Sequence, residues 1–341
     1  MEYPRHLKGK DLITTQEWDK KDLDIVLDVA REFKENRFNH PLSKSLLNKS
    51  FFMFFYNPSV RTRQSFEVAA TELGGHALFL EPKSMRLKTE KTAGETVEDA
   101  ANVMSQYAVG LGIRILEDAI PYYGAGDNLL REYAKYGNIP VVSMAHDKYH
   151  PCQGLADIMG LQNHLGKDLK GKKVLLTWAK GALVRSWSSV QEFLLIASRF
   201  GMEVTLAHPE GYDLDPEVIA NVKKNAEENG VDFKITHDVK EGYEGVQVVY
   251  SRNWMSPNAY RDGKLQKEEE REKALKFKEW ICDEEKWKLT DNALFIHPMP
   301  VDRGSEVTDE IASSKNSIIY EIAGNRLHVQ KAVMALTMGD F

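Results

Sequence analysis

The chain has 341 residues, of which 42% are hydrophobic and 28% are charged, the composition of a soluble globular protein. This length exceeds one ordinary hydrophobic core and suits two domains of roughly 150 residues each. The net charge of -6 argues against nucleic acid and anionic membranes as partners, because affinity for polyanions usually needs a basic excess.

The cysteines and the N-terminal residues bear on metal binding and on cellular location. The two cysteines cannot build a disulfide framework, and no Cys/His cluster has the spacing of zinc ligands. The first residues lack the apolar segment of a signal peptide, and no apolar run approaches the ~18 residues of a spanning helix. We therefore expect a cytoplasmic protein without a metal site.

Strands and helices are expected to alternate along the first half of the chain. After a leading helix at about 16–35, the apolar run 51–55 predicts a buried strand, and apolar spacing predicts a helix over 65–73. The remaining expected elements are strands at 77–80, 109–114 and 139–144 and a helix at about 95–107. This alternation predicts a parallel sheet covered by helices on both faces.

A polar, lysine-rich segment, 166–173, separates a second α/β series from the first. The second series comprises strands at 174–177, 203–206, 246–250 and 293–297 and helices at 186–199 and 216–228. The expected fold class is α/β, with two doubly wound parallel-sheet domains at 1–149 and 150–320 and a C-terminal helix, within 321–341, that packs back on the first domain. Such domains favour a binding cleft at the carboxyl ends of their strands.

Residues 57–63 form the first candidate binding motif. They lie between a predicted strand and a predicted helix and carry Ser59, Arg61 and Arg63. Free amides at a helix N-terminus, together with a hydroxyl and two guanidinium groups, suit a phosphate. The alternative is a surface helix start whose arginines are satisfied by carboxylates.

His150-Pro151-Cys152-Gln153 forms the second candidate motif, after the strand that ends near 144. His150 and Gln153 are three residues apart at a helix start, so both side chains can face a cleft and offer donors to a carbonyl oxygen. The alternative for a lone histidine is a structural role.

Together the two motifs resemble those of the aspartate/ornithine carbamoyltransferase family, in which Ser-Thr-Arg-Thr-Arg and His-Pro-x-Gln mark the carbamoyl phosphate site. Here Val60 replaces the usual threonine, which should matter little if a backbone amide holds the phosphate. The resemblance implies that an acceptor amine attacks the carbonyl of carbamoyl phosphate and that phosphate departs. The residues that it implies for catalysis are Arg61, Thr62, Arg114, His150, Gln153 and Arg326.

These residues divide by expected role. The resemblance implies that Arg61 and Arg114 neutralise the phosphate, while Thr62, His150 and Arg326 polarise the carbonyl oxygen and Gln153 orients the carbamoyl amide. Catalysis would then rest on orientation and electrostatics, without a covalent intermediate, metal or cofactor.

The same resemblance implies a partner. Family members are typically homotrimers, or multiples of trimers, in which a loop of a neighbouring subunit completes the active site. Ser84 and Lys88 are the loop candidates here, with exposed polar residues as the alternative reading. An isolated monomer should then be inactive.

The acceptor must be identified from the second domain, where the signals conflict. His297-Pro298-Met299-Pro300 looks like the aspartate branch, whereas the Asn-Arg-Leu-His at 325–328 looks like the ornithine branch. The stretches 176–178 and 200–214 are similar to acetylornithine and succinylornithine carbamoyltransferases, a subgroup with a knotted loop that the chain is long enough to form. Ornithine enzymes carry an aspartate before a tryptophan where this chain has Arg252 and Asn253, which suit a carboxylate or an amide better than an ammonium.

We therefore expect a carbamoyltransferase of amino-acid metabolism, in arginine biosynthesis, with ornithine or an N-acyl-ornithine as acceptor. Aspartate is the alternative acceptor, and a non-catalytic anion-binding relative is the alternative class; no Gly-x-Gly-x-x-Gly supports a dehydrogenase. Trp178 would wall an acyl pocket, with core packing as its alternative, and Arg185 and Arg303 would meet an acidic group. The residues expected to bind substrate are Ser59, Val60, Arg63, Ser84, Lys88, Trp178, Arg185, Asn253, His297, Pro298, Met299 and Arg303.

Overall fold

The computed structural model describes residues 3–82, 93–181 and 183–341. The chain divides into two compact units, one formed by residues up to Leu155 together with Gly324–Phe341, the other by Ala156–Ala323. The sequence placed these divisions at 149/150 and 320/321. Two helices, α5 (Pro151–Leu165) and α12 (Ile319–Met338), contribute residues to both units.

The first unit is built on a four-stranded parallel sheet of order β2-β1-β3-β4. Its strands are β1 (Ser50–Phe55), β2 (His76–Leu80), β3 (Gly110–Ile115) and β4 (Val141–His146). The apolar run of β1 occupies the middle of the sheet, where Phe54 pairs with Ile113 and is fully buried. A strand buried on both faces is uniformly apolar, which is why this run was recognisable in the sequence.

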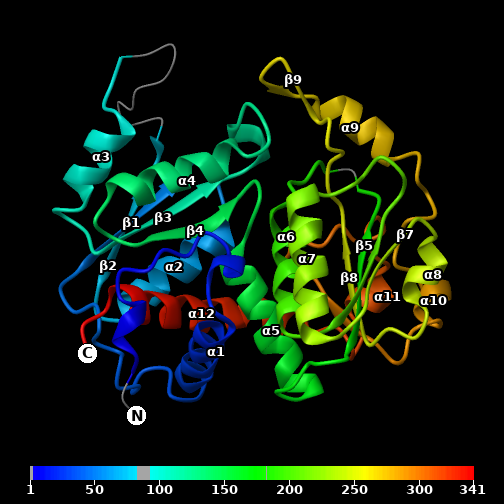
Figure 1. The fold of residues 1–341 in the computed structure, drawn as a ribbon, viewed down its shortest axis with the longest axis horizontal. Helices are drawn as coiled ribbons and strands as arrows, with labels where there is room; N and C mark the ends of the chain where they lie inside the picture. The colour runs from blue at the N-terminus through cyan, green and yellow to red at the C-terminus, as the bar shows by residue number, and fades with distance from the viewer. Residues whose placement is uncertain (1–2, 83–92, 182) are drawn as a thin grey trace. The chain divides into compact units, whose positions relative to one another are not determined.

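Helices cover both faces of this sheet (Figure 1). On one face lie α3 (Val97–Met104) and α4 (Ala125–Tyr136); on the other lie α1 (Lys20–Glu35), α2 (Val60–Glu72) and the carboxyl part of α12. Among the described residues of this unit, the connections contain three short 3-10 helices, η1 (Arg5–Leu7), η2 (Thr15–Glu17) and η4 (Glu117–Ala119).

The second unit repeats this architecture around a five-stranded parallel sheet of order β11-β8-β5-β6-β7. Its strands are β5 (Lys173–Trp178), β6 (Glu203–Ala207), β7 (Phe233–Thr236), β8 (Val248–Arg252) and β11 (Leu294–Ile296). One face carries α6 (Ser188–Arg199) and α7 (Pro216–Asn229), and the other carries α8 (Val239–Tyr243) and α10 (Glu284–Trp287) (Figure 1). The short helix α11 (Asp309–Ala312) follows β11.

An additional segment lies between β8 and α10. It consists of a hairpin, β9 (Tyr260–Arg261) with β10 (Lys264–Leu265), followed by helix α9 (Lys267–Ala274). The run of charged residues at 264–278 is typical of a solvated helix or loop. The helix is present, and its Glu270 is buried, which the charge run did not indicate.

The two-domain α/β prediction is confirmed, but some elements differ. Helix α2 begins at Val60 rather than at residue 65, because Ser59 caps it by accepting a hydrogen bond from the Thr62 amide. Helix α4 was not predicted; its N-terminus has no capping side chain of its own and follows Gly124 at φ +92°. The knotted loop stays a prediction. Among the described residues, no helix has the length and apolar character needed to cross a membrane.

Candidate active site

The junction between β1 and α2 presents the first motif at the carboxyl end of the first sheet. Ser59 caps α2, with 3.3 Å between the Thr62 amide nitrogen and the Ser59 hydroxyl oxygen. The side-chain oxygen of Asn57 accepts a hydrogen bond of 2.6 Å from the Leu116 amide, which ties the junction to the residue after β3. The cap places Arg61 and Thr62 in the first helical turn, where the helix dipole favours an anion.

Thr62 and Arg326 meet although 264 residues separate them in the chain. The Arg326 guanidinium donates a hydrogen bond of 3.2 Å to the Thr62 hydroxyl. Both side chains are buried, at 1% and 5% exposure. Helix α12 therefore adds Arg326 to the two arginines, Arg61 and Arg63, of the first turn of α2.

His150 and Gln153 are buried at the start of α5. The backbone amide of Gln153 donates a hydrogen bond of 2.9 Å to the backbone carbonyl of His150. Burial holds the pKa of His150 well below its ordinary value, and Arg326, Arg114, His146 and Arg61 lower it further. The imidazole is therefore neutral and can donate one N–H hydrogen bond. Among the described residues, its buried Nδ1 has no hydrogen-bond partner.

Other residues of the first motif point elsewhere. The Val60 side chain is 71% exposed, whereas Arg63 forms an ion pair of 2.8 Å with Glu67 and lies 3.9 Å from the centre of the Phe79 ring. Ser84 and Lys88 lie outside the described residues. The structure thus groups Ser59, Arg61, Thr62, Arg114, His150 and Arg326 and turns Val60 and Arg63 away from them.

A hollow of about 510 Å³ lies beside this junction. Phe55, Tyr56, Asn57 and Pro58 supply one part of its lining. The other lining residues are Phe79, Glu81, Pro82, Asp118 and Ala119. The first unit therefore has an open, largely apolar depression next to its cationic cluster.

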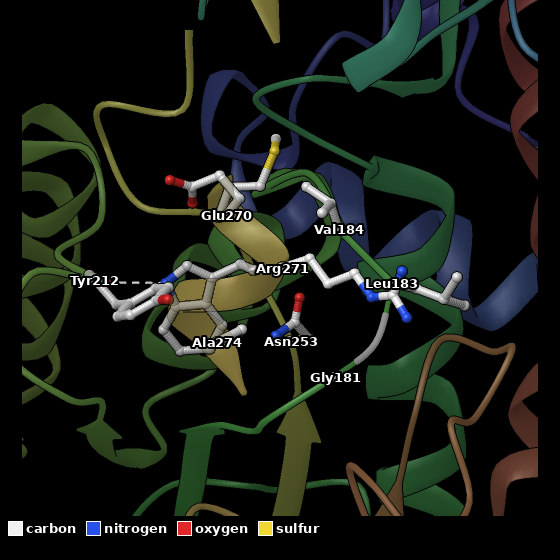
Figure 2. A pocket seen from close by; sticks show the side chains of 10 residues that line it. Gly181, Leu183, Val184, Tyr212, Asn253, Glu270, Arg271 and Ala274 are labelled. Carbon is white, nitrogen blue, oxygen red and sulfur yellow. Dashed lines mark hydrogen bonds between the residues drawn. The ribbon is translucent and has the colours of Figure 1, made fainter. Parts of the chain in front are cut away.

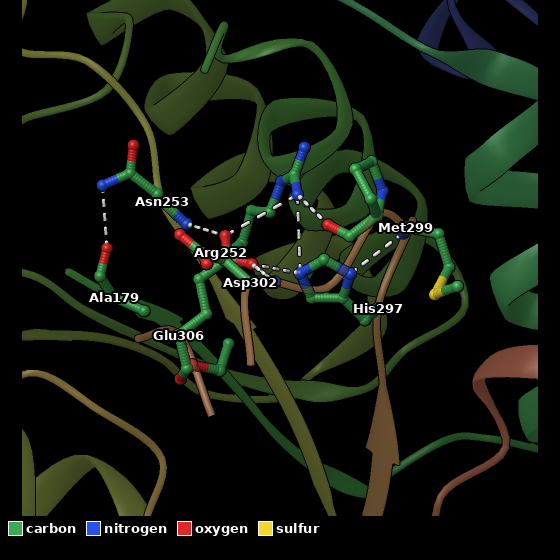
Figure 3. A network of polar contacts seen from close by, with 9 residues as sticks. Ala179, Arg252, Asn253, His297, Met299, Asp302 and Glu306 are labelled. Atoms are coloured by element: carbon green, nitrogen blue, oxygen red, sulfur yellow. Dashed lines mark hydrogen bonds and ion pairs between the residues drawn. The ribbon is translucent and has the colours of Figure 1, made fainter. Parts of the chain in front are cut away.

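The second unit contains a buried ionic network centred on Glu306, shown in Figure 3. The Glu306 carboxylate is 3.0 Å from the ring Nε2 of His297 and 3.6 Å from the Arg252 guanidinium. It also accepts hydrogen bonds from the amides of Asn253 and Asp302, both at 2.9 Å. One carboxylate therefore joins the loop after β8 to the loop after β11.

The charge state of this network follows from its contacts. Burial alone would raise the pKa of Glu306, but His297, Arg252 and the donated hydrogen bonds outweigh burial and lower it to about 2. The Nδ1 of His297 accepts a hydrogen bond from the Met299 amide at 2.9 Å, so the ring proton lies on Nε2, facing Glu306. Burial lowers the pKa of His297, so an Arg252–Glu306 pair with a neutral histidine results.

Arg252 ends β8 and is 8% exposed. Its Nη1 donates to the Pro300 carbonyl at 3.2 Å, whereas its buried Nε has no hydrogen-bond partner among the described residues. A buried guanidinium edge of this kind can accommodate an anion. Arg252 was noted in the sequence as suited to a carboxylate, but it was not included among the residues expected to bind substrate. Glu306 was not identified, because it lies in an ordinary polar run.

The predicted acceptor residues have varied positions in this unit. Asn253 is buried and donates its side-chain amide to the Ala179 carbonyl, and Pro298 and Met299 flank the His297 contact. Arg185 is partly buried, and its carbonyl accepts a hydrogen bond from the Met255 amide. Arg303 instead pairs with Asp309 at 3.0 Å, on the surface. Trp178 is fully buried, and its ring N–H donates to the Trp254 carbonyl.

Figure 2 shows a pocket of about 10 Å³ between α9 and the loop that carries Asn253. Glu270 of α9 accepts two hydrogen bonds from Ser256, from its amide at 2.7 Å and from its hydroxyl at 2.8 Å. Arg271 extends from the same helix toward Leu183 (Figure 2). A cavity of this size holds about one water molecule, so it does not admit an acyl group as it stands.

Among the residues that the structure describes, no group of three or more His, Cys, Asp or Glu side chains is placed to hold a metal ion. Both free cysteines are buried, and burial raises the pKa of Cys282 to about 12. The polar groups at the two sites can bind anions, donate hydrogen bonds and orient a substrate.

Comparison with curated proteins gives two kinds of relative. The N-acetylornithine carbamoyltransferase of Xylella fastidiosa is 36% identical over 337 residues, which cover 96% of this chain and 98% of the relative. The ornithine carbamoyltransferase of Pyrococcus horikoshii is also 36% identical, over 334 residues that cover 98% and 97%.

Solved structures are similar over the same length. Acetylornithine transcarbamylase complexed with acetylcitrulline superposes with a TM-score of 0.90 at 35% identity, covering 97% of this chain and all (100%) of that one. A variant of N-acetyl-L-ornithine transcarbamylase complexed with carbamyl phosphate and N-succinyl-L-norvaline gives a TM-score of 0.88 at 35% identity, covering 96% and 99%.

Family models match both halves of the chain. Residues 10–163 match the carbamoyl-P binding domain of aspartate/ornithine carbamoyltransferase, and residues 171–337 match the Asp/Orn binding domain. The chain therefore belongs to the aspartate/ornithine carbamoyltransferase family of carbamoyl-transferring enzymes.

Proposed function

We propose that this chain transfers the carbamoyl group of carbamoyl phosphate to the amino group of an N-acyl-ornithine-like acceptor that bears a carboxylate, releasing phosphate. The observation that carries the proposal is the cluster at the start of α2. There Thr62 and Arg326 are in contact, and a buried, neutral His150 lies in the field of Arg61, Arg114 and Arg326.

The donor site acts through charge and hydrogen bonding. Arg61, Arg114 and the amides at the start of α2 bind the phosphate and stabilise its negative charge as it leaves. Thr62, His150 and Arg326 donate toward the carbonyl oxygen, where negative charge develops when the amine attacks. Gln153 orients the carbamoyl amide. A neutral His150 suits this role because its N–H donates without adding a fourth positive charge to the three arginines.

The acceptor is inferred from the second unit. Relatives of equal identity are named for N-acetylornithine and for ornithine, so their names do not separate the two acceptors. Arg252 favours an acceptor with an anion at this position, because a free ammonium group would meet a like charge there. Glu306 neutralises Arg252 in the absence of substrate, and Asn253 adds an amide to the same loop. We therefore rank an N-acyl-ornithine first, ornithine second and aspartate third.

A panel assay tests the function. The protein is incubated with ¹³C-labelled carbamoyl phosphate and, separately, with N-acetylornithine, N-succinylornithine, ornithine, putrescine or aspartate, and the ureido carbon is followed by NMR. The proposal expects a product with an N-acyl-ornithine and a weaker one, or none, with putrescine. The Arg61→Gln variant serves as the control for uncatalysed carbamoylation.

Results of this panel can contradict the proposal at two levels. Product formation with aspartate alone would replace the acceptor and leave the donor site in place. Failure of all five amines, together with failure to bind carbamoyl phosphate, would support the non-catalytic relative.

The remaining expectations follow from the family. We propose a homotrimer, or a multiple of trimers, with active sites shared between subunits, acting in arginine biosynthesis in the cytoplasm. Sizing chromatography with simultaneous activity measurement tests the assembly, and an active monomer would contradict shared sites.

A further inference from the structure

The link between β4 and α5 determines where His150 lies. It consists of Asp147, Lys148, Tyr149 and His150 itself, and its first residue is fully buried. The His146 amide donates a hydrogen bond of 3.0 Å to the Tyr149 carbonyl, which closes the link into a tight turn. A displacement of Asp147 would therefore be passed on to His150, three residues later.

Asp147 is anchored to helix α4. Its carboxylate accepts hydrogen bonds from the backbone amides of Gly124 and Asp127, the second at 3.1 Å. These amides belong to the N-terminus of α4, which has no capping side chain within its own segment. Asp147, which directly follows β4, thus caps the 12-residue helix α4 from outside its own segment. Its negative charge suits the positive end of the helix dipole.

Gly126 provides the space for this contact. A Cβ atom at this position would lie 2.5 Å from an Asp147 carboxylate oxygen and 3.0 Å from an Ile115 methyl group. Glycine inside a helix is less stable than alanine by about 1 kcal/mol. The close approach of the Asp147 carboxylate gives a physical reason for glycine here.

The residue before Asp147 is held by the same helix turn. His146 is fully buried, with its Nδ1 2.7 Å from the Ser143 hydroxyl and its Nε2 3.2 Å from the Asp127 carboxylate. Arg131 donates to the other Asp127 oxygen at 2.8 Å. Burial opposes the charge of Asp127, but the nearby His146 ring and the hydrogen bond from Arg131 lower its pKa to about 2.

The first turn of α4 therefore contacts two consecutive residues where β4 ends, His146 and Asp147. The backbone amide of Asp127 donates to the Asp147 carboxylate, and the Asp127 carboxylate contacts the His146 ring. Two anchors on adjacent residues fix both the position and the direction in which the chain leaves β4. His150 follows this anchored segment and lies in the field of Arg61, Arg114 and Arg326.

We propose that Asp147 is a positioning residue that fixes His150 against the carbonyl oxygen of carbamoyl phosphate by tying the β4–α5 link to the N-terminus of α4. The inference rests on the proposed function for the identity of that oxygen. Asp147 itself touches no substrate in this account. Misplacement of His150 weakens a hydrogen bond that strengthens in the transition state, so the rate should fall more than substrate binding.

The test variant is Asp147→Asn. It preserves size but places an amide NH2 opposite one of the two backbone donors, so one hydrogen bond is lost. We expect kcat for carbamoyl transfer to fall at least tenfold, with the KM of the acceptor within about twofold of the wild-type value. Unchanged kcat in a folded variant overturns the inference.

A second variant covers the case in which Asp147→Asn does not fold. Gly126→Ala leaves every charge in place, improves helix propensity and forces the Asp147 carboxylate to shift. A fall in kcat without a fall in melting temperature is the expected result. Wild-type kcat together with an unchanged position of Asp147 in a crystal structure overturns the role given to Gly126. Wild-type kcat with a displaced Asp147 overturns the main inference.

The matched control is Asp238→Asn in the second unit. Asp238 also accepts hydrogen bonds from two backbone amides, those of Lys240 and Glu241, at the start of α8. The same chemical change there should leave kcat within twofold. A tenfold fall in this control would show that loss of any such cap lowers activity and would overturn the specific role of Asp147.

An NMR measurement separates this inference from the proposed function. The imidazole resonances of His150 are assigned by their loss in His150→Gln and followed through a pH titration. The groups facing this ring are Arg61 of α2, Arg114 of β3, His146 of β4 and Arg326 of α12. Burial lowers the pKa of His150 most, and these cations lower it further. Displacement of the ring in Asp147→Asn, and in Gly126→Ala where no charge is removed, should therefore raise the titration midpoint.

The two failures are then distinguishable. A wild-type protein that neither binds carbamoyl phosphate nor transfers its carbamoyl group refutes the proposed function, while the His150 titration still decides the positioning role. An identical His150 titration in wild type and Asp147→Asn overturns the inference, whether or not the enzyme is active.

Discussion

The two units of this chain are built alike, yet their polar sites are assembled in different ways. In the first unit, most of the site lies at two strand–helix junctions, where a cap and a helix start place the side chains. In the second unit, a single buried carboxylate, Glu306, joins the loops after β8 and β11. The first kind of site depends on local chain geometry, and the second depends on packing between distant segments.

In the proposed function, this difference separates donor from acceptor recognition. The first unit would offer several positive charges, with a neutral histidine among them, to a doubly charged phosphate group. The second unit offers one arginine whose charge is already balanced by Glu306. Changes in the first unit should therefore affect carbamoyl phosphate, and changes in the second should affect the acceptor.

The largest effect is expected for Arg61→Gln. Loss of a guanidinium that stabilises charge in the transition state should lower kcat/KM for carbamoyl phosphate by about a thousandfold. Arg63→Gln, two residues later, should lower it less than about threefold, because Arg63 pairs with Glu67. Steady-state kinetics measures both. Equal losses in the two variants would show that the site extends over the whole helix start.

The next largest effect concerns the stability of the second unit. Glu306→Gln leaves Arg252 buried without its counter-charge, so the free energy of unfolding should fall by roughly 3 kcal/mol. Denaturant titration measures this change. Glu285→Gln, an exposed glutamate paired with Lys240, is the control and should have no measurable effect.

The same carboxylate predicts a pH dependence. The pKa of Glu306 is about 2 in the folded chain, against 4.5 for the free group. A lowered pKa means that its stabilising contribution is complete above about pH 4.5 and is lost as the pH falls toward 2. The stability difference between wild type and Glu306→Gln should therefore shrink across this window. A constant difference would contradict an ionised Glu306.

A smaller and more selective effect is expected for Arg252→Gln. A charge-assisted hydrogen bond to a carboxylate is worth about 1.5–3 kcal/mol, so kcat/KM for N-acetylornithine should fall by about 10- to 100-fold. With N-acetylputrescine, which lacks the carboxylate, kcat/KM should be nearly the same for wild type and Arg252→Gln. Affinity for carbamoyl phosphate should not change. Equal losses with both acceptors would remove Arg252 from carboxylate recognition.

The smallest effect is expected for Val60→Thr, which restores the residue usual in the family motif. The Val60 side chain is 71% exposed, and any phosphate contact at this position would come from the backbone amide. We expect kcat and KM within twofold of wild type in the same kinetic assay. An increase above fivefold would indicate that the threonine hydroxyl contributes to the site.

Sequence patterns predicted the first unit more fully than the second for the same physical reason. Apolar runs and helical spacing revealed the strand at β1 and the helix at α2, and neighbouring residues carried the donor motif. The start of α2 was misplaced by five residues because the cap at Ser59 sets it, not the apolar spacing. Arg326 was identified by family resemblance, since nothing local connects it to Thr62.

The rest depended on three-dimensional packing. Glu306 lies in a polar stretch that looks like surface sequence, and its burial follows from the return of that loop over β8. Asp147 caps a helix that begins 22 residues earlier, so no cap signal appears beside α4 itself. The predicted role of Arg303 in meeting an acidic group of the acceptor stays a prediction; the structure shows Arg303 paired with Asp309.

Titration calorimetry of carbamoyl phosphate in the absence of an acceptor tests the division between the two units most directly. Wild type and Arg252→Gln should bind carbamoyl phosphate with the same affinity, and Arg61→Gln should bind it at least a hundredfold more weakly. Absence of binding to the wild type, or equal weakening by both variants, would contradict the assignment of the donor to the first unit.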